Sequence, residues 1–320
     1  TSQPELPKQP SNLNLPHSPF DRTVERKINQ SGPVSLQNLL IDCEAETDRL
    51  ISFIRRAAGE TLHKQGAVIG ISGGIDSSVT AALCVRALGA KRVVGVMMPE
   101  RDSNPRTLEW SRLVADRLGI RTFLRDITPI LSSFGFYSDL VEAIRGVIPE
   151  YGEDWKSKII ISDPVSNTEF AFFSVVAQSP DGARIRKRLP AEVFLKILAL
   201  SNFKQRTRKV LEYHFADRFN YLVAGTSNRL EADQGFFVKL GDGAGDIKPI
   251  AHLYKTQVFQ MAEHLGVPEE IRLRPPSADI HSLDQGQDEF FFVLPFEKMD
   301  ACVYGESNGV PAGEVAAAIG

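Results

Sequence analysis

Short apolar runs alternate with longer segments of helical periodicity along much of the chain. The run at 67–71 predicts a buried strand, the run at 92–98, which Pro99 ends, predicts a second parallel strand, and the segment at 121–126 predicts a third strand. The segments at 79–88 and 105–118 carry apolar residues at helical spacing, and the second begins at a proline, which suits the first turn of a helix. This β-α-β-α-β order predicts an α/β protein with a doubly wound parallel sheet.

The flanking regions extend this pattern. Residues 1–33 are rich in Pro, Ser, Asn and Gln, so we expect a mobile arm or a subunit-wrapping extension before a folded domain at 34–320. Ser35 is expected to cap a long first helix. A further helix is predicted at 190–219, and the apolar run at 220–226 predicts another core strand.

Residues 145–192 interrupt the alternation of strands and helices. The segments at 158–162 and 169–178 have the composition of strands, and Ser-Pro-Asp-Gly at 179–182 predicts a turn. We therefore expect a β-rich insertion, and we favour a surface hairpin over a functional lid as its role. The basic side chains at 184–188 are interpreted as the solvated face of this hairpin.

Composition narrows the classes of function. The formal net charge of −3 over 320 residues argues against a nucleic-acid-binding surface, and no apolar run is long enough to span a membrane. Cys43, Cys84 and Cys302 are widely spaced, which argues against a disulfide framework or a structural zinc site and fits a reducing compartment. No signal peptide is visible, so we expect a cytoplasmic protein.

The most informative chemistry lies between the first predicted strand and the helix after it. Gly70–Ser77 reads G-I-S-G-G-I-D-S, and a glycine turn before a helix presents unpaired backbone N–H groups to an anion. Asp76 is suited to hold a divalent cation on bound phosphates. A Walker A loop is excluded because no lysine follows the glycines. The segment instead resembles the pyrophosphate loop of the ATP pyrophosphatases, with an ordinary strand-to-helix turn as the alternative.

A second acidic segment follows the strand predicted at 220–226. Ligands of open α/β sheets gather at the carboxyl ends of the strands, so Thr226 and Glu231 are expected to face the same crevice as Asp76. Two carboxylates from separate loops suit Mg²⁺, although Glu231 alone is also compatible with a solvated acid at a helix start. Lys255, near the start of another predicted helix, is a candidate point charge for phosphate.

With these residues in view, the chain resembles the ammonia-dependent NAD synthetases, which belong to the ATP pyrophosphatase superfamily. The resemblance runs from about residue 36 to about residue 304, the insertion excluded. It rests on these motifs in order: S-G-G-I-D-S at 72–77, N-F-K-Q-R-T-R at 202–208, G-T-S-N-R-L-E at 225–231, G-F-F-V-K-L-G-D-G-A-G-D at 235–246, L-Y-K-T-Q at 253–257 and P-P-S-A-D-I at 275–280. The resemblance implies an adenine nucleotide alpha hydrolase-like fold.

The resemblance also implies roles for individual residues. Those expected to contact ATP are Gly70, Ile71, Ser72, Gly73, Gly74, Ile75, Asp76, Ser77, Thr226, Lys255 and Ser277. Those expected to contact deamido-NAD are Arg206, Lys239 and Asp246, and Asp242 is a weaker candidate to line the site. Asp76 and Glu231 are expected to bind Mg²⁺ and, with Lys255, to form the catalytic set.

The implied reaction is the ATP-dependent amidation of deamido-NAD by ammonia through an acyl adenylate, which releases AMP and pyrophosphate. About 65 residues precede the nucleotide strand, which is too few for a fused glutaminase domain, so free ammonia or a separate ammonia-supplying partner is favoured. The family also implies a homodimer with the acceptor site near the subunit boundary. We expect neither a nucleic-acid partner nor a membrane.

Departures from the family pattern leave the identity of the acceptor acid undetermined. Ser227 and Asn228 stand where the family often has Asp-His, Ser277 stands where threonine is common, and the basic closing segment of the family, which contains a His-Lys pair, does not occur up to Gly320. An adenylating ligase for another carboxylic acid, a tRNA-modifying pyrophosphatase and a nucleotide-binding module without turnover remain alternatives. The absence of a Cys-x-x-Cys pair disfavours the tRNA-modifying enzyme.

Overall fold

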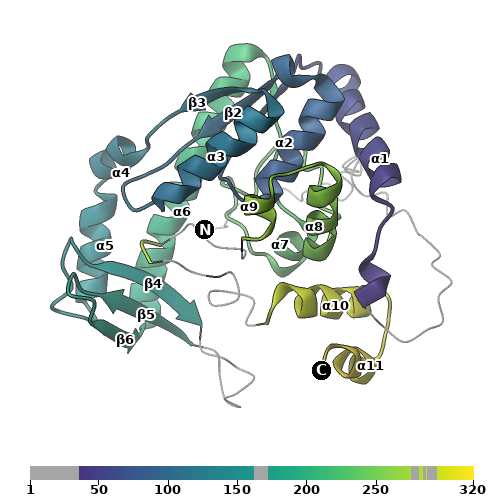
Figure 1. The fold of residues 1–320 in the computed structure, drawn as a ribbon. Coiled ribbons are helices and arrows are strands. Elements are labelled where there is room, and N and C mark those ends of the chain that lie inside the picture. Colours follow the sequence, from purple (N-terminus) through teal and green to yellow (C-terminus); the bar gives the residue numbers. More distant parts are fainter. Residues whose placement is uncertain (1–35, 162–171, 275–280, 284–285, 287–293) are drawn as a thin grey trace, which may run out of the picture. The chain divides into compact units, whose positions relative to one another are not determined.

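The computed structural model describes residues 36–161, 172–274, 281–283, 286 and 294–320, which lie in one compact unit, Val34–Gly320. Its centre is a four-stranded parallel sheet in the order β3-β2-β1-β7 (Figure 1). The strands are β1 (Ala67–Gly70), β2 (Val93–Met97), β3 (Arg121–Leu124) and β7 (Leu222–Val223).

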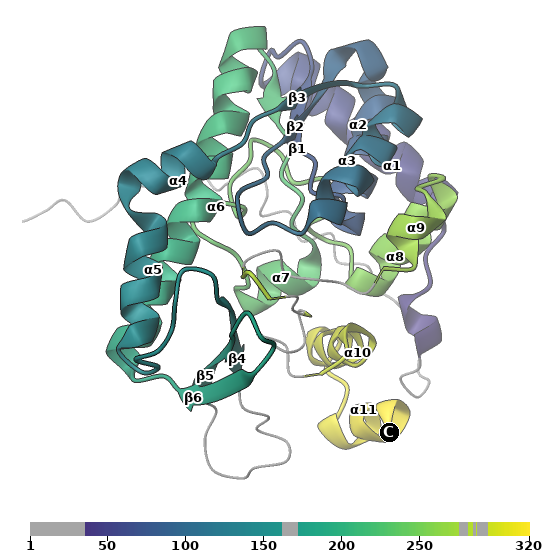
Figure 2. The same ribbon diagram turned by 60° about the vertical axis from the view of Figure 1, so that its left-hand side comes forward.

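Helices cover both faces of this sheet because successive strand residues point to opposite sides. Ile69 belongs to an apolar cluster with α1 (Cys43–Arg56), α2 (Ile75–Leu88), α3 (Pro105–Leu118) and α8 (Lys255–His264). Its neighbour Val68 belongs to a second cluster, formed with α4 (Thr128–Phe134), α5 (Phe136–Arg145) and α6 (Ala191–Phe219). This two-sided arrangement confirms the predicted α/β fold with a doubly wound parallel sheet (Figure 2).

A separate three-stranded antiparallel sheet is formed by β4 (Lys156–Ile161), β5 (Phe173–Gln178) and β6 (Arg184–Arg188). One of its faces is apolar and packs on α5 and the first turns of α6. The insertion is therefore β-rich, as the sequence predicts. Its basic residues form the edge strand β6, whereas the sequence predicts only the solvated face of a hairpin there.

The remaining elements are short or lie near the C-terminus. They are the 3₁₀ turns at Leu36–Leu39 and Ala90–Arg92, the π-helical turn at Ala57–Thr61, α7 (Arg229–Gln234), α9 (Glu269–Arg272), α10 (Phe296–Ser307) and α11 (Ala312–Ile319). The prediction that Ser35 caps the first long helix is wrong, because Asp42 is the N-cap of α1 and its carboxylate accepts from the Ala45 N–H. Within the described residues, none of the helices combines the length and the apolar character that crossing a bilayer requires.

Candidate active site

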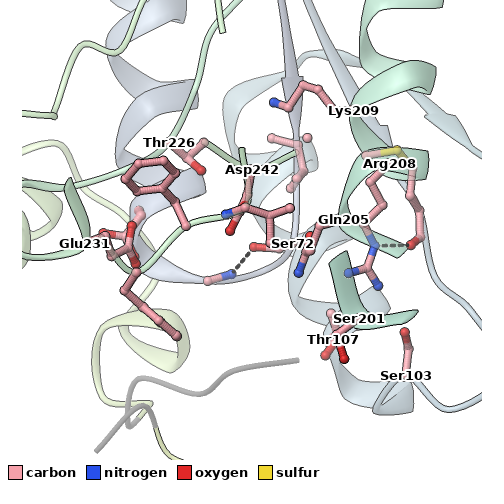
Figure 3. Close-up of a pocket in the computed structure, with 18 of the residues that line it drawn as sticks. Ser72, Ser103, Thr107, Ser201, Gln205, Arg208, Lys209, Thr226, Glu231 and Asp242 are labelled. Atoms are coloured by element: carbon pink, nitrogen blue, oxygen red, sulfur yellow. Dashed lines mark hydrogen bonds between the residues drawn. The ribbon is translucent and has the colours of Figure 1, made fainter. Parts of the chain in front are cut away.

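A cavity of about 550 Å³ lies at the carboxyl ends of β1 and β2 and along one side of α6. The loops after β1 and β7 form one wall, and α6 forms the wall opposite (Figure 3). This volume is within the range of small-molecule and cofactor sites. The position at the carboxyl ends of parallel strands is the one at which open α/β sheets bind ligands.

The glycine loop between β1 and α2 has a conformation that only glycine suits. Gly73 has a φ of 68°, and a Cβ atom there would lie 2.8 Å from the Cβ of Trp110 and 2.9 Å from the carbonyl oxygen of Thr107. Gly74 is the N-cap of α2, so the first N–H groups of the helix face the cavity end of the loop. The Ser77 hydroxyl donates to the Gly74 carbonyl at 3.0 Å and fixes the turn. The loop is therefore suited to an anion.

Two carboxylates approach each other beside this loop. Asp76, in the first turn of α2, accepts hydrogen bonds from the side-chain amide of Asn228 at 3.0 Å and from the ammonium group of Lys255. Glu231, in the first turn of α7, accepts from the Asn228 backbone N–H at 3.3 Å, while the Asn228 side chain accepts from the Glu231 N–H at 3.0 Å. Asn228 thus contacts both acids.

The charges of these groups are strongly interdependent. Burial, together with the nearby Asp76 carboxylate, raises the pKa of Glu231 to about 8, despite the attraction of Lys255. Burial alone would lower the pKa of Lys255, but Asp76 and Glu231 outweigh it, so the pKa of the ammonium group is raised. Lys255 therefore remains a cation in the cavity at neutral pH.

Lys255 is held in place by a residue from a distant part of the sequence. It is the first residue of α8, and its side chain is 2% exposed. Asp300 of α10 accepts from the backbone N–H groups of Lys255 at 3.2 Å and of Thr256 at 2.7 Å. The Asp300 carboxylate therefore acts as a cap supplied by another helix, which fixes the start of α8.

The middle of α6 contributes charged side chains to the opposite wall. Lys209 and Glu212 form an ion pair of 2.6 Å between side chains that are each 8% exposed. Arg208 donates from Nε to the Met98 carbonyl at 3.2 Å, which links α6 to the end of β2. A Cβ at Gly70 would lie 2.7 Å from a carboxylate oxygen of Glu212, so the helix packs closely against the start of the glycine loop.

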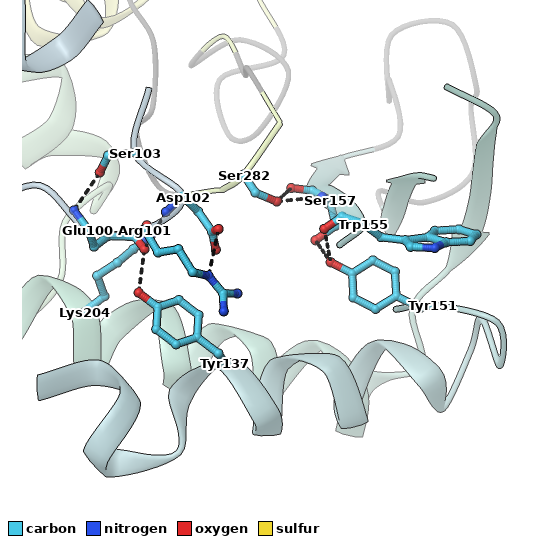
Figure 4. Close-up of polar contacts among 10 residues, drawn as sticks. All are labelled: Glu100, Arg101, Asp102, Ser103, Tyr137, Tyr151, Trp155, Ser157, Lys204 and Ser282. Carbon is cyan, nitrogen blue, oxygen red and sulfur yellow. Dashed lines mark hydrogen bonds and ion pairs between the residues drawn. The ribbon is translucent and has the colours of Figure 1, made fainter. Parts of the chain in front are cut away.

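A buried polar cluster outside the cavity holds the loop after β2 (Figure 4). Glu100 accepts from Lys204 of α6 at 3.0 Å and from the Tyr137 hydroxyl of α5 at 2.8 Å, and its carboxylate also accepts from the Asp102 N–H. The side chains of Glu100 and Lys204 are 2% and 3% exposed. Burial would raise the pKa of Glu100, but Lys204 and these hydrogen bonds lower it. The cluster fixes the loop that carries Ser103 into the cavity.

The cavity brings together most of the residues predicted for ATP and metal. The predicted residues that line it are Gly70, Ile71, Ser72, Gly74, Ile75, Asp76, Thr226, Glu231 and Lys255, together with the weaker candidate Asp242. Gly73 and Ser77 shape the loop without lining the cavity. Ser277 lies outside the described residues.

The residues predicted for deamido-NAD lie outside the cavity wall. Arg206 is exposed on α6 and donates from Nε to the Lys239 carbonyl at 3.1 Å. The Asp246 carboxylate accepts from the Val223 N–H at 2.7 Å and from the Tyr213 hydroxyl at 3.2 Å, so both of its oxygens have partners within the fold. Their assignment to the acceptor stays a prediction.

Asn228 and Asp300 were missed in the sequence analysis. Asn228 sits in the pattern N-x-x-E, a capping box, and this signal was sufficient to predict that it contacts Glu231. Its contact with Asp76 joins two segments that are distant in the sequence, and no pattern within either segment predicts it. The same applies to Asp300, which is 45 residues from the helix start that it caps.

The two carboxylates fit a magnesium ion. Among the described residues, no group of three or more His, Cys, Asp or Glu side chains is arranged to hold a metal. Mg²⁺ needs only one or two carboxylates when phosphate oxygens and water complete its octahedron. Burial and, after it, the neighbouring Asp76 carboxylate raise the pKa of Glu231, and a divalent cation between the two acids would offset their repulsion.

Comparison with known proteins places this chain in a family. The family model for NAD synthase matches residues 46–145 and 182–316. The NH(3)-dependent NAD(+) synthetase of Rhizobium meliloti is 51% identical over 281 residues, 88% of this chain and 84% of the relative. The enzyme of the same name from Thermotoga maritima is 39% identical over 253 residues, 79% and 84% of the two chains.

Solved structures show the same fold at lower identity. NMN synthetase from Francisella tularensis superposes with a TM-score of 0.61 at 22% identity, over 88% of this chain and 92% of that one. NH3-dependent NAD synthetase from Campylobacter jejuni superposes with a TM-score of 0.56 at 22% identity, over 87% and 92%.

Proposed function

The chain belongs to the NAD synthase family, and we propose that it catalyses the ATP-dependent amidation of deamido-NAD to NAD with ammonia. AMP and pyrophosphate are the other products. The observation that carries the proposal is the 51% identity to an NH(3)-dependent NAD(+) synthetase over most of both chains. The cavity, with its glycine loop, paired acids and buried lysine, has the groups that this chemistry requires.

In the first step an oxygen of the acceptor's pyridine carboxylate attacks the α-phosphorus of ATP, and the bond to the bridging oxygen of pyrophosphate breaks. Negative charge grows on the departing pyrophosphate. The N–H groups at the start of α2 and the ammonium group of Lys255 lie where they would stabilise that charge. Asn228 and Asp300 maintain this geometry through Asp76 and the start of α8.

In the second step ammonia attacks the carbonyl carbon of the acyl adenylate. A C–N bond forms, the bond from carbon to the AMP oxygen breaks, and the nitrogen loses a proton to give the amide. AMP is a far better leaving group than an oxide ion, which explains the use of ATP. The contribution of the protein is chiefly to position the two substrates and to compensate their charge.

Asp76 and Glu231 would hold Mg²⁺, which supplies charge neutralisation for the phosphates when it is bound. Lys255 already contacts Asp76, so this carboxylate would serve both the ammonium group and a bound cation. A bound cation also favours the ionised form of Glu231, whose pKa is raised in its absence.

We further propose that Arg206, Lys239 and Asp246 serve the acceptor, that Ser277 contacts ATP, and that the protein is a cytoplasmic homodimer supplied with free ammonia or with ammonia from a separate partner. Arg206 and Lys239 are exposed and lie beside each other, so both are accessible to an acceptor. Light scattering tests the dimer.

Transfer of oxygen from the acceptor to AMP tests the proposed chemistry directly. With deamido-NAD that carries ¹⁸O in its carboxylate, one labelled oxygen is expected in the phosphate of AMP, because that oxygen bridges carbon and phosphorus in the intermediate. Mass spectrometry of the AMP measures it. AMP without label from a reaction that produces NAD would contradict the acyl adenylate.

A further inference from the structure

The outer strand of the antiparallel sheet is strongly basic. Strand β6 reads Arg-Ile-Arg-Lys-Arg, and within the described part of the chain it pairs only with β5. All four basic side chains are exposed, and none of them forms an ion pair with a described residue. Asp181, the acid that precedes the strand, accepts from the Ser179 hydroxyl and the Ala183 N–H inside the turn. The strand thus concentrates positive charge on a chain whose net charge is −3.

The alternation of side chains along β6 gathers its arginines on one face of the sheet. Ile185 belongs to the apolar cluster that packs on α5 and α6, so the arginine row, Arg184, Arg186 and Arg188, points to the opposite, outer face. Strand β4 adds two more basic residues to this face, Lys156 and Lys158. Each of the three strands contributes three positions to the outer face, and five of these nine positions are basic while none is acidic.

The backbone of the arginine row is directed toward the free edge of the sheet. Leu189, directly after β6, donates from its N–H to the Phe173 carbonyl at 2.9 Å. Alternate residues of an antiparallel pair exchange such bonds, so Ile185 and Lys187, which are in phase with Leu189, also bond to β5. The N–H and carbonyl groups of the arginine row therefore point away from β5. This is the geometry to which another strand can add.

The inner face of the sheet is already occupied. Phe173 of β5 stacks on Phe194 of α6, with ring centroids 4.1 Å apart, and both rings line the cavity. Strand β6 contributes no residue to the described wall of that cavity, and it is the strand of its sheet that lies farthest from the parallel sheet (Figures 1 and 2). A partner on β6 would therefore bind from outside, without entering the active site.

The charges of the arginine row decide which strand fits this edge. Residues two apart in a strand are about 6.6 Å apart, so the three guanidinium groups repel one another in the sheet alone. A basic edge also repels the same edge of a second copy of the chain. Residues directly opposite on an added strand would lie with their Cβ atoms about 5.5 Å from those of the row. A carboxylate there can accept two parallel hydrogen bonds from a guanidinium group.

We propose that β6 is a docking edge for an extended, acidic segment of a partner protein. The segment adds to the sheet as a fourth strand and places a carboxylate at every second position against the arginine row. Main-chain hydrogen bonds supply affinity, and the ion pairs select the partner. The docking edge is independent of the proposed function, because it does not use the cavity. Binding is expected to weaken as the salt concentration rises.

Fluorescence anisotropy of a labelled peptide tests the docking edge. The peptide has about ten residues, in which glutamate alternates with threonine. We expect saturable binding, and we expect Arg184→Glu with Arg186→Glu to raise the Kd at least about tenfold, because two attractions become repulsions. The matched control is Lys91→Glu with Arg112→Glu, which makes the same change in net charge at exposed residues outside this sheet and is expected to keep the Kd.

Two substitutions at Arg186 separate the role of the backbone from that of the charge. Arg186→Pro and Arg186→Gln both remove one positive charge, but only proline removes the N–H group that points to the free edge. Arg186→Pro is expected to raise the Kd about tenfold above that of Arg186→Gln. Both variants keep the hydrogen bonds to β5, and thermal unfolding checks that they are folded. A peptide of the same composition with consecutive glutamates tests the same point on the wild-type protein and is expected to bind about tenfold more weakly.

Several outcomes would overturn the docking edge. They are the absence of saturable binding to the wild-type protein, equal affinity for the peptide with consecutive glutamates, and an equal loss of binding in the Lys91 and Arg112 control. Tighter binding of a single-stranded RNA oligonucleotide than of the peptide would assign the basic face to nucleic acid instead. Formation of NAD by the same proteins is measured in parallel, so that a failure of the docking edge is distinguished from a failure of the proposed function.

Discussion

Asn228 determines how the two acids of the cavity lie toward each other. Its side-chain oxygen and backbone N–H bind the Glu231 residue in a capping box, and its amide nitrogen donates to Asp76. Burial and, after it, the neighbouring Asp76 carboxylate raise the pKa of Glu231, because two ionised carboxylates at close quarters repel each other. A residue that holds both at once fixes the distance at which a cation can join them.

Asn228→Ala is expected to lower kcat/KM about tenfold to a hundredfold, since a hydrogen bond to a charged group is lost at the site. It also removes a helix cap, at a cost of about 1 kcal/mol in the free energy of unfolding. Asp42→Ala is the control, because it removes the cap of α1 without touching the cavity. Equal activity of the two variants would show that Asn228 acts only as a cap.

The ion pair of Glu100 and Lys204 shows how the stability of the fold depends on a buried charge keeping its partner. Both side chains are almost fully buried, so each charge relies on the other (Figure 4). Removal of one partner leaves an uncompensated charge, whereas removal of both does not. The same helix carries an exposed pair, Lys196 and Glu192, at the same distance of 3.0 Å.

Lys204→Met is expected to lower the free energy of unfolding by about 3–5 kcal/mol, and the double variant with Glu100→Gln is expected to recover much of that loss. Lys196→Met should change it by less than about 1 kcal/mol, because exposed ion pairs contribute little. Urea denaturation measures the free energy of unfolding of the two single variants and of the double variant. A double variant as unstable as Lys204→Met would exclude an uncompensated charge as the cause.

Helix α10 fixes the start of helix α8, although the two helices are distant in the sequence. Asp300, which is fully buried, caps the first turn of α8 and thereby fixes the backbone of Lys255. The position of Lys255 is thus determined by a helix that does not itself reach the cavity. We expect changes in α10 to affect the reaction through α8.

Asp300→Ala is expected to destabilise the protein by about 1–2 kcal/mol and to lower kcat more than it raises the KM for ATP. Asp300→Asn keeps one side-chain oxygen that accepts hydrogen bonds. Its stability and its kcat are therefore expected to lie between those of the wild type and of Asp300→Ala. Steady-state kinetics and urea denaturation separate the two effects. A variant that loses stability but keeps its kcat would show that α8 holds Lys255 without this cap.

Elements with strong local signals were predictable. The helix at 105–118 agrees with α3 in both bounds, because Pro105 and the glycine after Leu118 mark its ends. The strand predicted at 220–226 is shorter, Leu222–Val223, since the chain leaves the sheet after an isolated bridge at Ala224. Strand β6 was missed because its basic residues have little strand propensity and are held by pairing with β5.

The glycine loop and the acids after β7 were predictable because both follow strands of one parallel sheet. The contacts that complete the site were not predictable, because each depends on tertiary packing: Asn228 contacts Asp76, Asp300 caps the start of α8, and Phe173 lines the cavity. The largest revision concerns the insertion. The sequence favoured a surface hairpin, whereas the structure places Phe173 in the cavity wall.

Taken as a whole, the molecule joins a nucleotide site at the edge of a parallel sheet to a second sheet at the far end of α6. The most direct test of the proposed function is an assay with ATP, Mg²⁺, ammonium and deamido-NAD in which NAD and AMP are quantified together. We predict equal amounts of the two, dependent on ammonium and abolished by removal of the metal with a chelator. AMP without NAD would show that the acceptor is wrong, and formation of neither would contradict the assignment as an NAD synthetase.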